Sequence, residues 1–384
     1  MKKICFIIAI ILALCMLPIQ SLKDCVFAAS DDLEIKSPAA YVCDYYSGKV
    51  VYEKNAEEKR PIASMTKVVS LAVVFDEINK GNVKLSDKIT VSKTAADTEG
   101  SSAFLDAGSS YGLEELIKTI VIASANDSMV AISEHVSGTE NIFVHKMNEY
   151  AKSIGMTNSN FENSTGLPSL NAYSTAKDMS KAIKQIIDNE IFNRYCKVWM
   201  DEIIHPSGRK TELVNTNRLV KTFNFIQGGK TGHTNTAKYC FVGVAKKGDT
   251  RIIASILGAE DSKTRFSELK DLYSYAFANY TNKIIVDNQK QVAEIVVKNA
   301  KCGNVGVKSD RNLCIFEKNN EIGEYKIVTK IEPQKAPLAA GTVVGKIYLT
   351  ETNGIVVDEA NLVTMDFVPV LSLQDVITKL VERW

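Results

Sequence analysis

Residues 61–70 read PIASMTKVVS, a stretch in which Ser64 stands three residues before Lys67. This spacing puts both side chains on one face of a helix, and apolar periodicity predicts that the helix runs from about Ala63 to Asn79. Two interpretations are open: Lys67 activates Ser64 as a nucleophile, or the pair only opens a core helix. The spacing alone does not decide, because Ser-x-x-Lys also occurs at residues 174–177, 207–210 and 267–270.

The segments on both sides of this helix predict one domain, residues 30–282. Alternating apolar residues predict β-hairpins near its two ends, and longer periodic stretches predict helices between and after them. The expected elements are a hairpin at 39–53, mostly helices over 113–188, strands at 237–246 and 251–257, and a helix at 263–279. This order predicts an α+β fold in which both ends contribute strands to one antiparallel sheet covered by helices.

The pattern changes after about residue 282. Short alternating stretches separated by Gly and Asn predict a small all-β domain over residues 283–369, with a spacer or interaction role. Residues 370–384 predict an amphipathic helix that begins with the capping pair Ser372 and Asp375. Its apolar stripe suits a membrane interface or the protein's own surface. The stripe consists of Leu373, Ile377, Leu380, Val381 and Trp384.

Residues 1–29 have the pattern of a signal peptide. Two lysines precede an apolar run over residues 4–17, and small residues that suit cleavage follow at Ala28 and Ala29. The apolar run is shorter than the ~20 residues that span a bilayer, which favours cleavage over a transmembrane anchor. We therefore expect an exported, extracytoplasmic protein.

Charge and cysteine usage exclude several classes of protein. The formal net charge is +1, which argues against nucleic-acid binding through a basic surface. Five cysteines follow the signal segment, and an odd number is not a disulfide framework, although Cys302 and Cys314 could pair across a hairpin. The four histidines and the cysteines show no zinc-ligand spacing, so neither a metal nor a cofactor is expected.

Two further short motifs follow the Ser-x-x-Lys pair. Ser124-Ala125-Asn126 lies between predicted helices at 113–123 and 127–137, and Lys230-Thr231-Gly232 lies just before the predicted strand at 237–246. Ser-x-Asn is a weak signal because it also occurs at 169–171, whereas Lys-Thr-Gly occurs once. In this order the three motifs form the signature of serine penicillin-binding proteins and β-lactamases.

The chain resembles the low-molecular-mass penicillin-binding proteins that act as D-alanyl-D-alanine carboxypeptidases. The similarity is carried by PIASMTK, ASANDS and GGKTGHT, and by NFENSTGLP, which is similar to the family's Asn-x-x-Gly-Leu segment. It covers about residues 34–280 and implies a β-lactamase/transpeptidase-like fold. The signal peptide, the small β domain and the amphipathic tail complete the family layout.

The resemblance implies that Ser64, Lys67 and Ser124 are catalytic. A serine hydroxyl needs a base to become a good nucleophile, and Lys67 is that base if burial and a nearby cation, Lys230, lower its pKa. Ser124 would relay protons, and Asn126 would orient Lys67 and bind the substrate backbone. Capping of the following helix is the alternative role for Ser124 and Asn126.

The resemblance also implies how the substrate is held. In the family the third motif lies on a sheet edge, where an extended peptide can add as a strand, and Gly232 permits close backbone approach. Lys230 and Thr231 would bind the terminal carboxylate, with support from Arg265, whose alternative is a surface salt bridge. The backbone N–H groups of Ser64 and His233 would form the oxyanion hole.

The implied reaction removes the terminal D-alanine from peptidoglycan stem peptides, and β-lactam antibiotics would acylate the same serine. Two departures bear on this. Ala125 replaces the glycine of many relatives, and no Glu-x-x-Leu-Asn segment is present, which argues against a β-lactamase. A D-alanyl cross-link endopeptidase and a catalytically silent cell-wall or β-lactam binding module are the alternatives.

Overall fold

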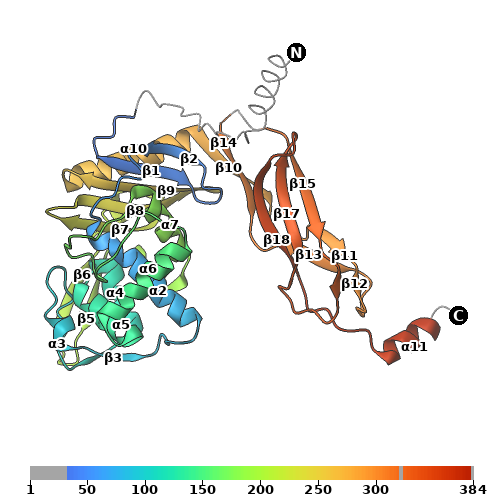
Figure 1. The fold of residues 1–384 in the computed structure, drawn as a ribbon, viewed down its shortest axis with the longest axis horizontal. Coiled ribbons are helices and arrows are strands. Elements are labelled where there is room, and N and C mark those ends of the chain that lie inside the picture. Colours follow the sequence, from blue (N-terminus) through green and yellow to red (C-terminus); the bar gives the residue numbers. More distant parts are fainter. Residues whose placement is uncertain (1–32, 320–322, 382–384) are drawn as a thin grey trace, which may run out of the picture. The chain divides into compact units, whose positions relative to one another are not determined.

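The computed structural model of the chain describes residues 33–319 and 323–381 (Figure 1). The predicted signal peptide and the last residue of the predicted stripe, Trp384, lie outside these ranges. The described residues from Ile35 onward belong to one unit. The division of the chain at residues 282 and 369 stays a prediction.

A five-stranded antiparallel sheet carries the third motif, Lys230-Thr231-Gly232. Its strand order is β2-β1-β9-β8-β7. The strands are β1 (Ala39–Asp44), β2 (Val50–Lys54), β7 (Ile226–Thr234), β8 (Lys238–Lys247) and β9 (Thr250–Ala259). The N-terminal hairpin joins the C-terminal one through the pairing of β1 with β9. The predicted sheet built from both ends is therefore confirmed.

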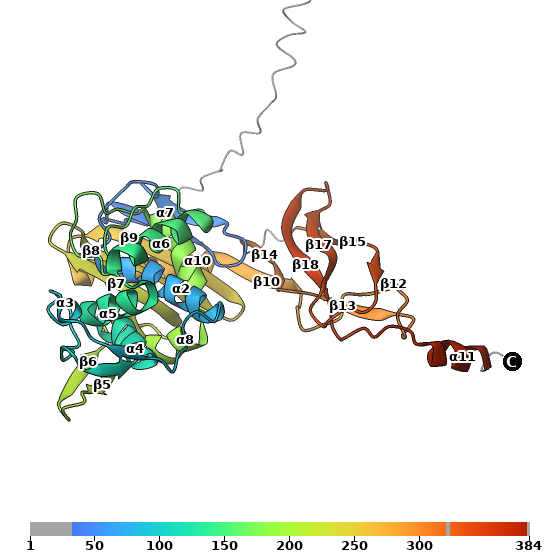
Figure 2. The same cartoon turned by 60° about the horizontal axis from the view of Figure 1, so that its bottom comes forward.

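Helices cover both faces of this sheet. Helix α10 (Ser262–Asn279) packs on strands β8 and β9, and α7 (Ala176–Ile186) packs on the other face (Figures 1 and 2). Helix α2 (Thr66–Asn79) contacts α7, α5 (Asn126–Ser137) and α6 (Glu140–Ser153). Every residue of α2 from Thr66 to Phe75 is buried. The first ten residues of α2 are therefore buried on every face and not along one stripe, as expected of a helix inside a core.

Several elements of this part lack a strong sequence pattern. The helix predicted from Ala63 begins as a short 3-10 turn, η1 (Ala63–Met65), and continues as α2. The short helices are α3 (Lys93–Ala96), α8 (Glu190–Cys196) and α9 (Leu219–Thr222), whereas α4 (Leu113–Ala123) forms at the range that the sequence predicted. The short strands are β3 (Lys88–Thr90), β4 (Ser110–Gly112), β5 (Met200–Ile204) and β6 (Lys210–Val214). No alternation predicted β7, because its glycines hide the pattern expected of a strand; only the family resemblance implied a sheet edge for the third motif.

The C-terminal part is all β before the final helix, as predicted. Strand β10 (Tyr280–Val286) pairs with β14 (Leu313–Lys318), and a second sheet has the order β11-β13-β18-β17-β15. Its strands are β11 (Ala293–Ile295), β13 (Val305–Ser309), β15 (Tyr325–Ile331), β17 (Val343–Glu351) and β18 (Val356–Thr364). The short strands β12 (Val297–Lys298) and β16 (Gln334–Lys335) pair in parallel. Buried aliphatic residues between 286 and 368 form a core of their own.

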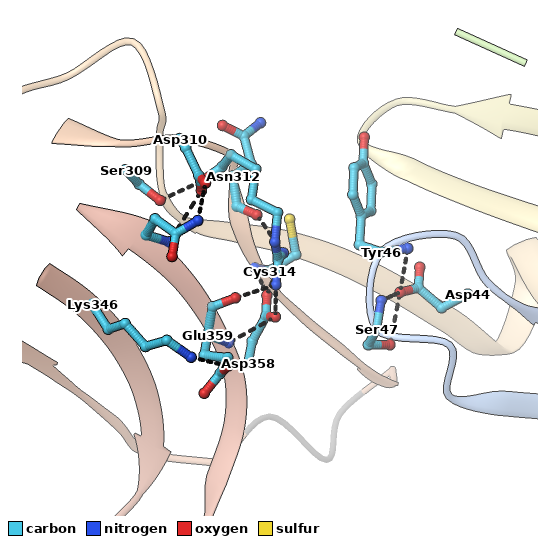
Figure 3. A network of polar contacts seen from close by, with 12 residues as sticks. Asp44, Tyr46, Ser47, Ser309, Asp310, Asn312, Cys314, Lys346, Asp358 and Glu359 are labelled. Carbon is cyan, nitrogen blue, oxygen red and sulfur yellow. Dashed lines mark hydrogen bonds and ion pairs between the residues drawn. The ribbon is translucent and has the colours of Figure 1, made fainter. Parts of the chain in front are cut away.

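A polar network ties β14 to β17 and β18 (Figure 3). The Asp358 carboxylate accepts hydrogen bonds from the Arg311 guanidinium and, at 3.1 Å, from the Cys314 N–H. Lys346 pairs with Glu359 at 2.8 Å. The buried Asp358 is thus paired and hydrogen-bonded, which offsets the cost of burying its charge.

The final helix, α11 (Leu373–Val381), begins with the predicted capping pair. The Asp375 N–H donates to Ser372 Oγ at 3.2 Å, and the Ser372 N–H donates to the Asp375 carboxylate at 2.9 Å. Leu373, Ile377 and Val381 are exposed. In the described part of the chain, no helix is both long and apolar enough to cross a membrane.

The described cysteines are all free. Cys302 is exposed, whereas Cys314 is buried in β14, and the possible bond between them is not formed. Within residues 33–319 and 323–381, no group of three or more His, Cys, Asp or Glu side chains could hold a metal ion.

Candidate active site

Ser64 lies in the turn η1, directly before α2. Ala63 has a left-handed φ of 50°, an uncommon conformation for a residue with a side chain. Lys67 follows in the first turn of α2 and is fully buried. Its Nζ lies 3.1 Å from Ser64 Oγ, so the structure brings together the pair that the sequence singled out.

Lys67 has two further acceptors. Its Nζ lies 2.5 Å from Asn126 Oδ1 and 2.7 Å from the backbone oxygen of Thr165. Burial, together with the positive charge of Lys230, holds the pKa of Lys67 well below its usual range. Burial and a nearby cation are the two conditions that the sequence analysis set for Lys67 to act as a base.

Lys230 is a second buried lysine of the site. Lys230 Nζ donates to Ser124 Oγ at 2.7 Å and to the backbone oxygen of Thr231 at 3.0 Å. Both Lys230 and Ser124 are buried. Burial and the charge of Arg265 lower the pKa of Lys230 to about 7, so this lysine can exchange a proton near neutral pH.

The turn between α4 and α5 presents the second motif. Ser124 caps α4 with a left-handed φ of 65°, and Asn126 begins α5. The Asn126 side chain bridges Lys67 to the Glu99 backbone oxygen, to which its Nδ2 donates at 2.6 Å. The geometry therefore suits the expected orienting role of Asn126. Its amide N–H₂ already has a partner in the protein.

The third motif lies on β7, the last strand in the sheet order. Thr231 Oγ1 donates to Thr216 Oγ1 at 2.7 Å. A Cβ on Gly232 would lie 2.3 Å from the backbone oxygen of Ile62. The close approach that requires glycine is therefore to the residues before Ser64, which lets η1 pack against β7. Substrate contact is not needed to explain it.

His233 and Arg265 occupy different environments. His233 is exposed at the end of β7, and its ring stacks at 4.1 Å between centroids on Tyr239. Arg265 is buried, and its Nη1 donates to the backbone oxygens of Gly232 at 3.3 Å and Cys240 at 3.1 Å. Arg265 thus forms no surface salt bridge, because its guanidinium points under β7 and supports the strand.

Sequence reasoning missed the residues that act through the backbone. Asn163 Oδ1 accepts hydrogen bonds from the N–H groups of Thr165 and Gly166, which closes a tight turn. This turn aims the Thr165 carbonyl at Lys67. A Cβ on Gly166 would lie 2.0 Å from Ala63 O. No side-chain pattern in the sequence marks a backbone carbonyl that will accept a hydrogen bond, although the segment NFENSTGLP is similar to the family's Asn-x-x-Gly-Leu segment.

The whole arrangement places the Ser64 hydroxyl next to the buried Lys67 amine, with a second buried amine, that of Lys230, on β7, the last strand in the sheet order. One amine can accept a proton from Ser64, the other can supply positive charge, and the edge strand can pair with an extended peptide. These are the elements of a serine acyl-transfer site. The fold and the site together define a serine hydrolase of the penicillin-binding class.

Comparison with known proteins gives the family. The family model described as D-alanyl-D-alanine carboxypeptidase matches residues 25–261, and that described as the penicillin-binding protein 5 C-terminal domain matches residues 280–376. The chain belongs to the D-alanyl-D-alanine carboxypeptidase family.

Individual relatives are similar to this protein over most of the chain. It is 34% identical to D-alanyl-D-alanine carboxypeptidase DacF of Bacillus subtilis, covering 86% of this chain and 85% of that one. It is also 34% identical to DacC of Escherichia coli, with 88% and 87% covered. The structure of penicillin-binding protein 5 from Haemophilus influenzae is similar with a TM-score of 0.69 at 28% identity, covering 88% and 98%. The expected fold is confirmed.

Proposed function

We propose that this protein is a serine carboxypeptidase that removes the terminal D-alanine from peptidoglycan stem peptides. The observation that carries the proposal is the buried Lys67 amine, whose Nζ lies 3.1 Å from Ser64 Oγ, within one site with a second buried lysine, Lys230. Family membership and the relatives' names support the same activity.

In the proposed mechanism, neutral Lys67 accepts the proton of Ser64 Oγ as that oxygen attacks the carbonyl of the penultimate D-alanine. Lys230 and Thr231 hold the terminal carboxylate, and backbone N–H groups of Ser64 and His233 stabilise the oxyanion. A proton passes through Ser124 to the leaving D-alanine nitrogen, and water then hydrolyses the acyl-enzyme. Arg265 acts indirectly, by supporting β7 and keeping the pKa of Lys230 low.

The first test is D-alanine release from a peptide ending in Lys-D-Ala-D-Ala. We expect release by the unmodified protein and none by Ser64→Ala. Ser267→Ala is the matched control, because Ser267 begins another Ser-x-x-Lys pair but is exposed on α10. It should release D-alanine at the unmodified rate. Absence of release from all three proteins would favour the cross-link endopeptidase or the silent binding module.

β-Lactams are proposed as covalent ligands of the same serine. Labelled penicillin should therefore attach to the unmodified protein and to Ser267→Ala, and not to Ser64→Ala. Labelling without D-alanine release would identify a binding module or an enzyme that requires a cross-linked substrate.

We also propose that the protein is exported and that α11 contacts a membrane surface. The exposed Leu373, Ile377 and Val381 support the second point. Comparing membrane and soluble fractions with and without residues 370–384 tests it. An unchanged distribution after deletion would show that α11 is no anchor.

A further inference from the structure

His205 directly follows β5, at the start of the turn that leads to β6. Of the four histidines, all of which the structure describes, it alone is buried. Its ring meets the ring of Tyr111 on β4 edge-on, with 5.8 Å between the centroids. The proposed mechanism gives no role to this ring, although a buried imidazole needs hydrogen-bond partners at both nitrogens.

The contacts of the ring assign its protonation state. Arg209 Nη2 lies 3.2 Å from His205 Nδ1, and a guanidinium can only donate. Nδ1 therefore accepts, and the neutral ring carries its proton on Nε2, which donates to Thr211 Oγ1 at 2.8 Å. Tyr111 Oη lies 2.8 Å from the same Nδ1. A second proton on the ring would set one N–H against the N–H of Arg209.

The charged groups around His205 act in both directions. Burial and then the charge of Arg209 lower the pKa of His205 from its ordinary value. Three carboxylates from three segments raise it, those of Asp106 before β4, Glu115 on α4 and Asp127 on α5. Asp106 Oδ2 lies 3.8 Å from Nδ1. The lowering effects are the larger, so the ring is neutral at pH 7 and takes up a proton in more acidic solution.

Arg209 also holds the loop of residues 99–106. The same Nη2 donates to the Phe104 backbone oxygen at 2.5 Å and to Asp106 Oδ1 at 2.8 Å. Phe104 has a left-handed φ of 57°, a conformation that persists where surrounding contacts hold it. Neutral His205 is compatible with this position of Arg209, whereas a charged ring 3.2 Å away would repel the guanidinium.

The first half of this loop holds the second motif. The Asn126 N–H donates to the Ser101 backbone oxygen at 2.7 Å, and Asn126 Nδ2 donates to the Glu99 backbone oxygen at 2.6 Å. A Cβ on Gly100 would lie 2.7 Å from the same Nδ2, so the loop packs directly on this amide. Asn126 Oδ1 in turn lies 2.5 Å from Lys67 Nζ. A displacement of the loop therefore changes how Lys67 is held.

We propose that His205 is a positioning residue of the acyl-transfer site. In its neutral form it keeps Arg209 on the loop of residues 99–106, and the loop keeps Asn126 against Lys67. Protonation of His205 displaces Arg209, releases the loop and slows acylation. The ring itself touches neither the substrate nor the reacting atoms. This inference rests on the proposed function, because it concerns the same nucleophile.

The pH dependence of penicillin acylation gives the first test. A single ionisation changes a rate by at most about tenfold per pH unit, and protonation of Lys67 supplies one such step. Protonation of His205 should make the decline steeper than this over part of the range between about pH 6.5 and pH 4.5. His205→Gln can still accept from Arg209 and never becomes charged, so it should lose the excess steepness. His145→Gln, exposed on α6, should keep it.

Arg209→Gln removes the group through which His205 acts. We expect acylation near pH 7 to be slower by about 3- to 10-fold, and the decline in acid to be no steeper than one ionisation allows. Lys210→Gln is the matched control, because Lys210 is the next residue and an exposed cation that pairs with Glu202. It should change neither the rate nor the steepness.

Hydrogen exchange follows the loop without reference to catalysis. The protection of the Asn126 and Leu105 N–H groups, corrected for the intrinsic effect of pH, should fall in acid in the unmodified protein. It should stay constant in His205→Gln. Titration of the His205 ring by NMR gives the pH at which the fall should occur.

The outcomes separate the two proposals. An acid decline no steeper than tenfold per pH unit in the unmodified protein overturns the role of His205, as does protection of Asn126 that stays constant while His205 titrates. Both measurements need no variant, so they decide even if His205→Gln is unstable. Absence of both penicillin labelling and D-alanine release means that the proposed function itself has failed, and hydrogen exchange then still decides whether His205 holds the loop.

Discussion

In the proposed mechanism, Lys67 and Lys230 have opposite tasks, although both are buried lysines. Lys67 must be neutral to take the proton of Ser64, whereas Lys230 must be charged to bind a carboxylate. The environment of each lysine sets its pKa. Burial and the charge of Lys230 lower the pKa of Lys67, and burial and the charge of Arg265 lower the pKa of Lys230. Such paired shifts are typical of acid–base sites.

The rate of acylation should therefore have a bell-shaped dependence on pH. Lowering a lysine pKa makes the neutral form available at lower pH, so the rate rises as Lys67 loses its proton. The rate falls again as Lys230 loses its own proton near pH 7. The second-order rate constant for D-alanine release, measured from pH 5 to 9, tests this.

Lys230→Arg identifies the descending limb. Arginine stays charged, so the limb should move to higher pH even though the maximum rate falls. A rate that still rises through pH 9 in the unmodified protein would show that the charge of Lys230 is not required.

Gly166 lets the turn of residues 163–166 pack closely against the backbone of Ala63 and Ser64. Its φ is 84°, and an added Cβ would meet the backbone of Ala63 and Ser64. Gly166→Ala should therefore reduce the free energy of unfolding by about 1–3 kcal/mol through overpacking, beyond the cost of its φ, and should slow penicillin acylation by more than tenfold. Urea unfolding and labelling rates measure the two effects.

Gly208→Ala is the matched control for this prediction. Gly208 has a φ of 83°, but a Cβ there meets nothing within 4 Å. It should show only the conformational cost, about 1 kcal/mol, with an unchanged acylation rate. Equal effects at both glycines would show that the contact with Ala63 is unimportant.

Helix α5 and the loop before α4 are joined through Asp127. This buried carboxylate accepts hydrogen bonds from Ser102 Oγ at 2.7 Å, the Ala103 N–H at 3.0 Å and the Leu105 N–H at 3.1 Å. The neighbouring Asn126 holds the same loop through Glu99 and Ser101. The second motif is thus positioned by a helix start and a loop together.

Asp127→Ala should lower the free energy of unfolding by about 2–4 kcal/mol, because these three donors and the Ser128 N–H lose one carboxylate acceptor. Hydrogen exchange at Ala103 and Leu105 should accelerate in the variant, and urea unfolding gives the stability. Asp97→Ala removes an exposed acid close by in sequence and should change neither quantity. Unchanged exchange in Asp127→Ala would show that the loop is held by other contacts.

Two hydrophobic cores in the described part of the chain are separate from each other. One gathers residues between 39 and 257, and the other gathers residues between 286 and 368. The residues proposed for the reaction all precede the second core in the sequence. A ligand bound there stabilises only the part that binds it.

Scanning calorimetry of the full chain should therefore show two transitions. Saturating penicillin should raise the Tm of one by several degrees and leave the other in place. In Ser64→Ala, penicillin should change the Tm of neither transition. A single transition that moves as a whole would mean that the two cores unfold as one cooperative unit.

The order of the main elements, the α+β class of the first part and the all-β character of the second could be predicted from the sequence. Apolar periodicity is a local property, so the helices α2, α4, α5 and α10 and the hairpin strands followed from it. The three motifs could be found because side chains such as Ser64, Lys67 and Lys230 are visible in the sequence.

How these motifs meet could not be predicted, because it depends on the packing of the folded chain. The Thr165 carbonyl, the β7 edge and the glycine contacts at Gly166 and Gly232 depend on segments about 100 or more residues apart in the chain. The lowered pKa values of Lys67 and Lys230 arise from burial and from mutual charge, neither of which a local pattern contains. Backbone contacts and long-range electrostatic interactions cannot be recognised in the sequence, because they form only when the chain folds and packs.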